Sequence, residues 1–166
     1  TKYKIAVISD RNNQVKNEKA DIYIIDKLDR QTITFSDKVL FDSGESDLKK
    51  EGYEVLNIVG PVIANNLKNI SEIQIQGHAD TVDTDDYNLA LASSRAMAVY
   101  KFLQVAVGIN PADYLMSASS FGKYKPVGRE AGQEFDIDRL KAANATDDLK
   151  AQNRRIEIVL FYKNEL

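Results

Sequence analysis

The sequence predicts an α+β domain, a mixed β-sheet covered by helices, and two observations lead to this prediction. Segments in which apolar and polar residues alternate, as in strands, take turns with longer segments whose apolar residues recur at helical spacing. With 166 residues, of which 43% are hydrophobic, the chain is long enough for one domain with a packed core. Apart from the N-terminal region and the first hairpin strand, the order is β-α-β-α-β-insertion-β.

The N-terminal region is expected to form an arm followed by a hairpin. Residues 1–20 are predicted to be a linker or peripheral arm, because a polar run without periodicity dominates them, although residues 3–7 alternate as a short strand would. Residues 21–26 and 32–35 are rich in residues that favour strands and flank the charged turn 27–30. This arrangement predicts a β-hairpin.

The first helix is expected after the turn at residues 42–44. Its apolar face consists of residues at helical spacing, namely Leu48, Val55, Val59, Val62 and Leu67. Ser46 and Asp47 are candidates for its N-cap. Pro61 lies inside the pattern and should kink the helix or divide it in two, because proline removes a backbone donor.

A strand and a second helix come next. Around residues 73–76 apolar and polar side chains alternate, so this strand should bury one face only. The second helix is predicted over residues 86–107. Its apolar stripe contains Leu91, Ala92, Ala96, Val99, Leu103 and Ala106.

Two further strands, separated by a long insertion, complete the predicted sheet. Residues 114–120 are predicted to form one strand, and residues 155–162 alternate and should close the sheet. The polar connection over residues 122–152 is too long for an ordinary loop and should be either functional or partly mobile. A short helix is expected within it near residues 138–143.

Composition excludes several classes of function. The net charge is −3 and no basic stripe with interleaved aromatic residues is present, which argues against a nucleic-acid partner. The absence of cysteine excludes disulfides, thiolate metal sites and a cysteine nucleophile. No apolar run is as long as a membrane span. The chain begins with Thr1 rather than Met, so we expect a fragment or a mature form with any export signal or anchor upstream.

Asp80 and Arg95 are the strongest candidates for a binding site. Asp80 follows a strand through Gly77, and Arg95 lies close to the apolar stripe of the second helix, where a charge without a partner would cost several kcal/mol. Arg95 should therefore have a fixed anionic partner. That partner is either Asp80, in a purely structural ion pair, or the carboxylate of a ligand. Together, an acid and an arginine can bind a zwitterion that carries an amine and a carboxylate on one carbon.

Other polar groups suggest no catalytic or metal chemistry. His78 is the only histidine and is expected to be a structural hydrogen-bonding residue, since one histidine cannot build a zinc site. The acidic loop at residues 81–86 lacks the glycine of an EF-hand and should be a solvated loop before the helix. No nucleophile elbow is present. We therefore predict neither an enzyme nor a cofactor.

Arg154 and Arg155 begin the last predicted strand. Adjacent side chains of a strand point to opposite faces, so at most one of the two can reach a site shared with Arg95. The alternative is that both are exposed charges that protect a strand end.

Several short motifs together resemble the OmpA-like peptidoglycan-binding domain, also known from the C-terminal part of MotB. They are Val39-Leu-Phe-Asp-Ser-Gly-Glu-Ser-Asp-Leu48, Gly77-His-Ala-Asp80, Tyr87-Asn88, Arg95-Ala96, Phe121-Gly122 and Asn153-Arg-Arg-Ile-Glu157. Each motif alone is weakly specific, whereas their order and spacing are strongly specific. The resemblance covers residues 32–162.

The resemblance implies non-catalytic binding of the peptide stem of peptidoglycan, in which the acid and the helix arginine hold the amino and carboxylate groups of diaminopimelate. These roles fall on Asp80 and Arg95. The further binding residues implied by the family motifs are Asn88, Asp42, Ser43, Arg154 and Arg155.

The resemblance also implies a domain organisation and a location. Residues 21–166 would form one OmpA-like domain with an N-terminal hairpin extension, a core over residues 32–162 and an insertion over about residues 123–152. The hairpin resembles MotB-type stator proteins of the flagellar motor more than the tail of a barrel protein. We expect a periplasmic domain whose parent protein is anchored to a membrane outside this sequence. The alternative is a protein–protein or homodimerisation module of a motor-like complex that does not bind the wall.

Overall fold

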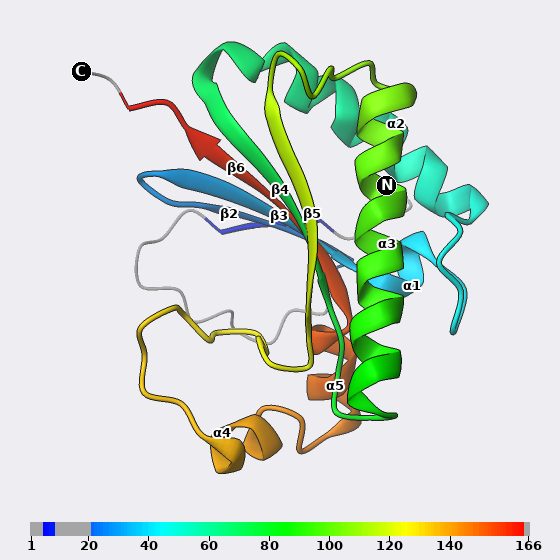
Figure 1. Ribbon diagram of the computed structural model, residues 1–166, viewed down its shortest axis with the longest axis vertical. Helices are drawn as coiled ribbons and strands as arrows, with labels where there is room; N and C mark the ends of the chain where they lie inside the picture. Colours follow the sequence, from blue (N-terminus) through cyan, green and yellow to red (C-terminus); the bar gives the residue numbers. More distant parts are fainter. Residues whose placement is uncertain (1–4, 9–20, 165–166) are drawn as a thin grey trace.

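The computed structural model describes residues 5–8 and 21–164, and these form a six-stranded sheet with helices (Figure 1). The strand order is β1-β2-β3-β6-β4-β5. The strands are β1 Ile5–Ile8, β2 Ile22–Asp26, β3 Arg30–Ser36, β4 Ile70–His78, β5 Leu115–Gly122 and β6 Arg155–Tyr162. The predicted arm lies outside the described residues apart from β1, which pairs in parallel with β2.

The sheet is mixed, which confirms the predicted α+β class. The predicted hairpin is the antiparallel pair β2–β3, β6 is antiparallel to both β3 and β4, and β4 is parallel to β5. The last strand does not close the sheet at an edge, as the sequence order suggested, but lies at its centre. Its consecutive buried residues Ile158, Val159 and Leu160 fit this position, since a central strand is covered on both faces.

The helices over the sheet are α2 (Lys50–Asn65) and α3 (Asp85–Val105), with a short helix α1 (Asp37–Leu40) and a 3₁₀ turn η1 (Leu67–Asn69). Residues of α2 and α3 share one buried cluster with the sheet; examples are Leu56, Val99 and Ile75. In Figure 1, α3 runs along the sheet beside β5. None of the helices within residues 21–164 combines the length and the hydrophobicity needed to span a bilayer.

Helix α2 differs from the prediction at its start. Its N-cap is Lys49, with no side-chain cap, so Ser46 and Asp47 do not cap it. The reason is that Leu48 is held in a β-bridge with Phe41, which delays the helix until residue 50. Pro61 lies within the helix without dividing it.

Strand β4 is buried more completely than predicted. Its first half alternates, but Gln76 and His78 are also buried, at 5% and 4% exposure, so the prediction of a single buried face is wrong for its end. Phe121, near the end of β5, helps to cover the second face, where its ring stacks on His78 with ring centroids 5.3 Å apart. On the opposite face, a Cβ at Gly77 would lie 2.0 Å from the carbonyl oxygen of Ala92, so only glycine lets α3 approach this closely.

The insertion is tied to the rest of the domain. It contains the expected helix, α4 (Ile137–Ala142), and a second one that was not expected, α5 (Asp147–Asn153). The amide of buried Asn153 accepts from Val127 N at 2.8 Å and donates to the carbonyl oxygen of Ala143 at 2.9 Å. Glu130 pairs with Lys27 of the β2–β3 turn at 3.1 Å. These contacts fix the segment at one end of the sheet (Figure 1).

Candidate functional site

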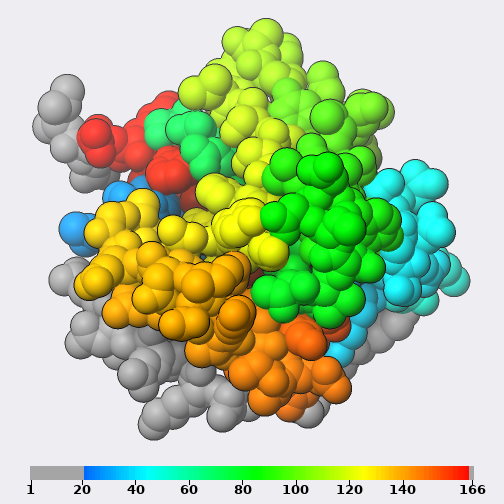
Figure 2. All heavy atoms as spheres, turned by 60° about the horizontal axis from the view of Figure 1, so that its bottom comes forward, coloured from blue at the N-terminus to red at the C-terminus, as the bar shows by residue number. Residues whose placement is uncertain are grey.

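Three chain segments meet at the end of the sheet where β3 and β4 end and β6 begins. In the strand register, Ser36 and His78 both lie opposite Arg155, so the residues that follow β3 and β4 and the residue before β6 are neighbours. A pocket of about 410 Å³ opens here between the loop after α1, the loop after β4 and the N-terminal half of α3. Figure 2 looks onto this end of the molecule, with α3 beside the insertion.

Asp80 lies in the wall of the pocket and is only 4% exposed. Its Oδ1 accepts a hydrogen bond from Val82 N at 2.9 Å, which holds the loop after β4 in a tight turn. Its Oδ2 accepts from Nη1 of Arg154 at 2.6 Å. Both carboxylate oxygens are therefore oriented by the protein, and one of them already pairs with a cation.

Arg95 lies in the opposite wall and is 6% exposed. Its Nε donates to the carbonyl oxygen of Glu45 at 2.8 Å and its Nη2 to that of Asp42 at 3.2 Å. Its Nη1 donates to Oδ2 of Asp37 at 3.1 Å, and its guanidinium lies 5.0 Å from the ring centre of Phe41. The anionic partner expected for Arg95 is thus a protein carboxylate, from Asp37.

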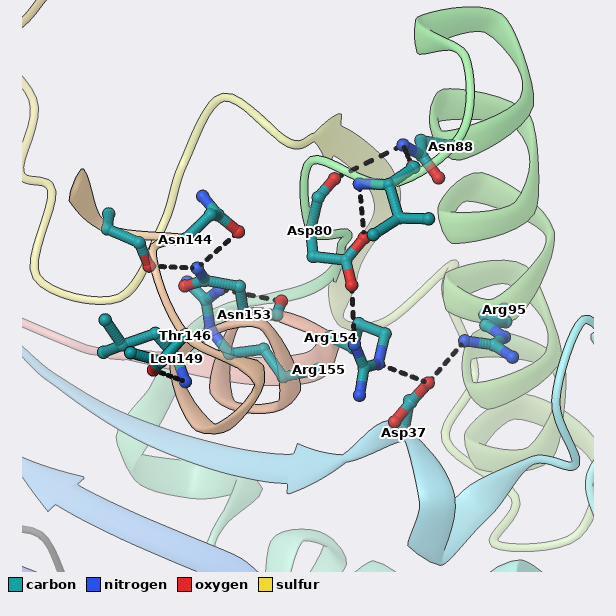
Figure 3. Close-up of polar contacts among 12 residues, drawn as sticks. Asp37, Asp80, Asn88, Arg95, Asn144, Thr146, Leu149, Asn153, Arg154 and Arg155 are labelled. Carbon is teal, nitrogen blue, oxygen red and sulfur yellow. Dashed lines mark hydrogen bonds and ion pairs between the residues drawn. The ribbon is translucent and has the colours of Figure 1, made fainter. Parts of the chain in front are cut away.

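A direct Asp80–Arg95 ion pair, the structural alternative raised by the sequence, is absent from the contacts of the described residues. The two residues are linked instead through two others (Figure 3). Arg154 pairs with Asp80 and lies 3.8 Å from Oδ2 of Asp37, which in turn pairs with Arg95. The result is a row of alternating charges, Asp80–Arg154–Asp37–Arg95, along the pocket.

Asp37 is the site residue that the sequence reasoning missed. It directly follows β3 and begins α1, and its side chain is 18% exposed. The available signal was its position, since an acid at the exit of a predicted strand was the reason for selecting Asp80. The predicted strand ended at Phe35, and the sequence does not reveal that the apolar residues after Asp37 form a helical turn.

The other predicted residues take different positions. Asn88 is buried and donates to the carbonyl oxygens of Asp80 and Val82, so it fixes the loop after β4. Ser43 lines the pocket, whereas Asp42 is exposed and contributes its backbone carbonyl oxygen to Arg95. Each of these residues therefore lies at or beside the pocket.

The two adjacent arginines point to different surroundings, and only Arg155 belongs to β6, because Arg154 is the C-cap residue of α5. Arg154 lines the pocket with a side chain that is 39% exposed. The side chain of Arg155 is 3% exposed and lies outside the pocket, where it pairs with Glu157 at 2.8 Å and donates to the carbonyl oxygen of Lys125 at 3.0 Å. Arg155 thus anchors the insertion.

His78 does not have the hydrogen-bonding role expected for it. Neither ring nitrogen has a hydrogen-bond partner among the described residues, although Nε2 lies 3.7 Å from Oε2 of Glu157. Burial, followed by the positive charge of Arg155, lowers the pKa of His78 from 6.5 to about 3, so the ring is neutral. No group of three or more potential metal ligands occurs in the part of the chain that the structure describes.

The charges that line the pocket are balanced. Three acids, Asp37, Asp80 and Asp83, face three bases, Lys38, Arg95 and Arg154. A pocket with fixed charges of both signs is complementary to a ligand that also carries both, and less so to a simple anion or cation.

Comparisons with known proteins agree with this fold. The model of the OmpA family matches residues 40–139. The chain is 34% identical over 119 residues to the peptidoglycan-associated lipoprotein of Pseudomonas aeruginosa, a match that covers 71% of this chain and 58% of the lipoprotein. The chain thus spans little more than half the length of that relative.

Two solved structures have a similar fold. The cell wall anchor of the T6SS from Pseudomonas aeruginosa has a TM-score of 0.63 at 23% identity, with 86% of this chain and 89% of that chain covered. The periplasmic domain of Helicobacter pylori MotB has a TM-score of 0.64 at 20% identity, with 85% and 82% covered.

Proposed function

The chain belongs to the OmpA family, and on this premise we propose that it binds the peptide stem of peptidoglycan without catalysis, anchoring an envelope protein to the cell wall. One observation carries the proposal: buried Asp80 and buried Arg95 line one pocket, each oriented by several protein contacts. The names of the similar proteins, a peptidoglycan-associated lipoprotein and a cell wall anchor, support the same role.

The ligand group that suits this pocket is the amino-acid end of diaminopimelate. Asp80 would accept hydrogen bonds from its ammonium group. Arg95 uses three of its five N–H groups in the contacts described, which leaves two for a ligand carboxylate. Charge-assisted bonds of this kind are stronger than neutral ones and impose geometry. Ser43 would form part of the wall beside the bound group.

The proposed function implies a location and a form of the parent protein. A domain that binds the wall acts in the periplasm, and the similar MotB domain is itself described as periplasmic. Wall binding restrains a protein usefully when the rest of it is held in a membrane, so we propose a membrane-anchored parent. Homodimerisation through another surface would be compatible with this role.

Co-sedimentation with purified diaminopimelate-type sacculi tests the proposal. The first variant is Asp80→Asn, which keeps an acceptor for Val82 N but removes the charge. We expect its binding to fall by about tenfold or more, since a charge-assisted hydrogen bond contributes about 1.5–3 kcal/mol. Asp113→Asn makes the same change of charge at an exposed turn and should bind like the wild type. Arg95→Lys should also bind weakly, because lysine lacks the planar fork.

Three results would contradict the proposal. Undiminished sacculus binding by folded Asp80→Asn would remove Asp80 from the site. No binding by folded wild-type protein would favour the alternative, a protein–protein module, and sedimentation velocity would then show whether the chain self-associates. Release of muropeptides from sacculi would contradict a non-catalytic role.

A further inference from the structure

We propose that Arg154 holds the position that the ammonium group of a ligand takes at Asp80, and that its displacement on binding makes the pocket select zwitterions over simple amines. This inference rests on the proposed function and adds a specificity determinant to it. It starts from the row of alternating charges Asp80–Arg154–Asp37–Arg95 (Figure 3).

The position that a ligand ammonium needs at Asp80 is already taken. Oδ1 of Asp80 is bound by Val82 N, and Oδ2 is bound at 2.6 Å by Nη1 of Arg154. Because Asp80 is 4% exposed, an incoming ammonium has little room to approach it without moving Arg154. Binding therefore exchanges one cation for another at the same carboxylate.

Of the two pocket arginines, Arg154 is the one that can move. Its side chain is 39% exposed, and among the described residues its one ion pair at hydrogen-bonding distance is the pair with Asp80. Arg95 has a side chain that is 8% exposed and is held by three hydrogen bonds to separate acceptors. Arg95 is thus a fixed anchor, whereas Arg154 is displaceable.

A displaced Arg154 still needs an anion. Asp37 lies 3.8 Å away but already pairs with Arg95, so one carboxylate would serve two guanidinium groups. A zwitterion supplies the missing negative charge through its own carboxylate, next to both arginines. A simple amine supplies none, and its ammonium is repelled by the displaced guanidinium. The exchange is therefore favourable only for a ligand that carries both charges.

Two soluble probes with the same spacing of amines test this inference. Meso-diaminopimelate carries a carboxylate beside each amine, and 1,5-diaminopentane is the same skeleton without the carboxylates. Backbone amide NMR titrations would give a Kd for each probe with wild-type protein, Arg154→Gln and Arg139→Gln. Arg139 is exposed on α4, and its substitution makes the same change of charge away from the pocket. Thermal unfolding would check that each variant is folded.

We expect wild type and Arg139→Gln to prefer meso-diaminopimelate strongly. In Arg154→Gln the preference should shrink by about fivefold or more, because Asp80 is freed for the diamine and the zwitterion loses one cationic partner. This inference would be overturned if folded Arg154→Gln kept the wild-type preference or no longer bound either probe. Sacculus binding by the wild type would still support the proposed function in both cases. Failure of the wild type to bind sacculi would remove the proposed function itself.

Discussion

Acid should destabilise this domain well above the pH at which its carboxylates titrate, and His78 is the reason. The ring is buried at 4% exposure, and its pKa is lowered to about 3, first by burial and then by the charge of Arg155. In the unfolded chain the same ring takes up a proton near its ordinary pKa of 6.5. Between these values the unfolded state binds more protons than the folded state, so stability must fall as the pH falls.

The size of this effect follows from the two pKa values. At about pH 5 the unfolded ring is almost fully protonated and the folded ring is not, which corresponds to a loss of about 2 kcal/mol relative to about pH 7.5. For a domain of this length, that loss lowers the Tm by roughly 4–8 °C. Burial raises the pKa of Glu157, but Arg155 and His78 lower it more, to about 2. The stability that Glu157 contributes to the folded domain is therefore lost mainly below pH 4.5.

Urea unfolding at several pH values between about 5 and 7.5 would measure the effect. Because His78 is the only histidine, His78→Gln should remove nearly all of the pH dependence in this range, whatever its cost at neutral pH. An NMR titration of the His78 ring should show no protonation of the folded state above about pH 5. A stability that is flat over this range in the wild type, or an equal slope in His78→Gln, would refute the reasoning.

Three other substitutions test the architecture by urea unfolding and hydrogen exchange. Gly77→Ala should lower the free energy of unfolding by about 3 kcal/mol or more, because the new Cβ would lie 2.0 Å from the carbonyl oxygen of Ala92. A loss of less than about 1 kcal/mol would mean that β4 and α3 can move apart. Thr84→Ala removes the N-cap hydroxyl of α3 that accepts a hydrogen bond from Tyr87 N, and it should lower the free energy of unfolding by about 1 kcal/mol. An unchanged urea midpoint would show that the cap is dispensable. Asn153→Ala should increase amide exchange throughout the insertion, since three of its hydrogen bonds tie that segment down; unchanged exchange would place the anchor elsewhere.

The features predicted correctly are those that local patterns control. The alternation over residues 155–162 and the helical spacing over residues 86–107 gave elements whose ends differ from the observed β6 and α3 by at most two residues. Strand order was not accessible in this way, because the central position of β6 depends on pairing with distant strands. Helix α5 was missed since it has few apolar residues and is held by the contacts of Asn153.

In the candidate site, too, local sequence patterns predicted some features and not others. Asp80 and Arg95 were selected from their places on a strand exit and a buried helix face, and the structure brings both to one pocket. The partners of each could not be predicted, because Asp37 reaches Arg95 from 58 residues away and Arg154 reaches Asp80 from 74 residues away. Sequence spacing carries no information on such pairs. The neutral state of His78 likewise follows from its burial, to which the distant residue Phe121 contributes.

The central position of β6 has a consequence for how the molecule assembles during synthesis. Without β6 the sheet falls into two pieces, β1-β2-β3 and β4-β5, which have no common hydrogen-bonded edge. Asp37 follows the first piece, Asp80 follows the second, and Arg154 precedes β6. The row of charges can therefore form only after the last strand has emerged and inserted between the two pieces. Ligand binding would report on complete folding, and a nascent or C-terminally truncated chain would present two open strand edges instead of a pocket.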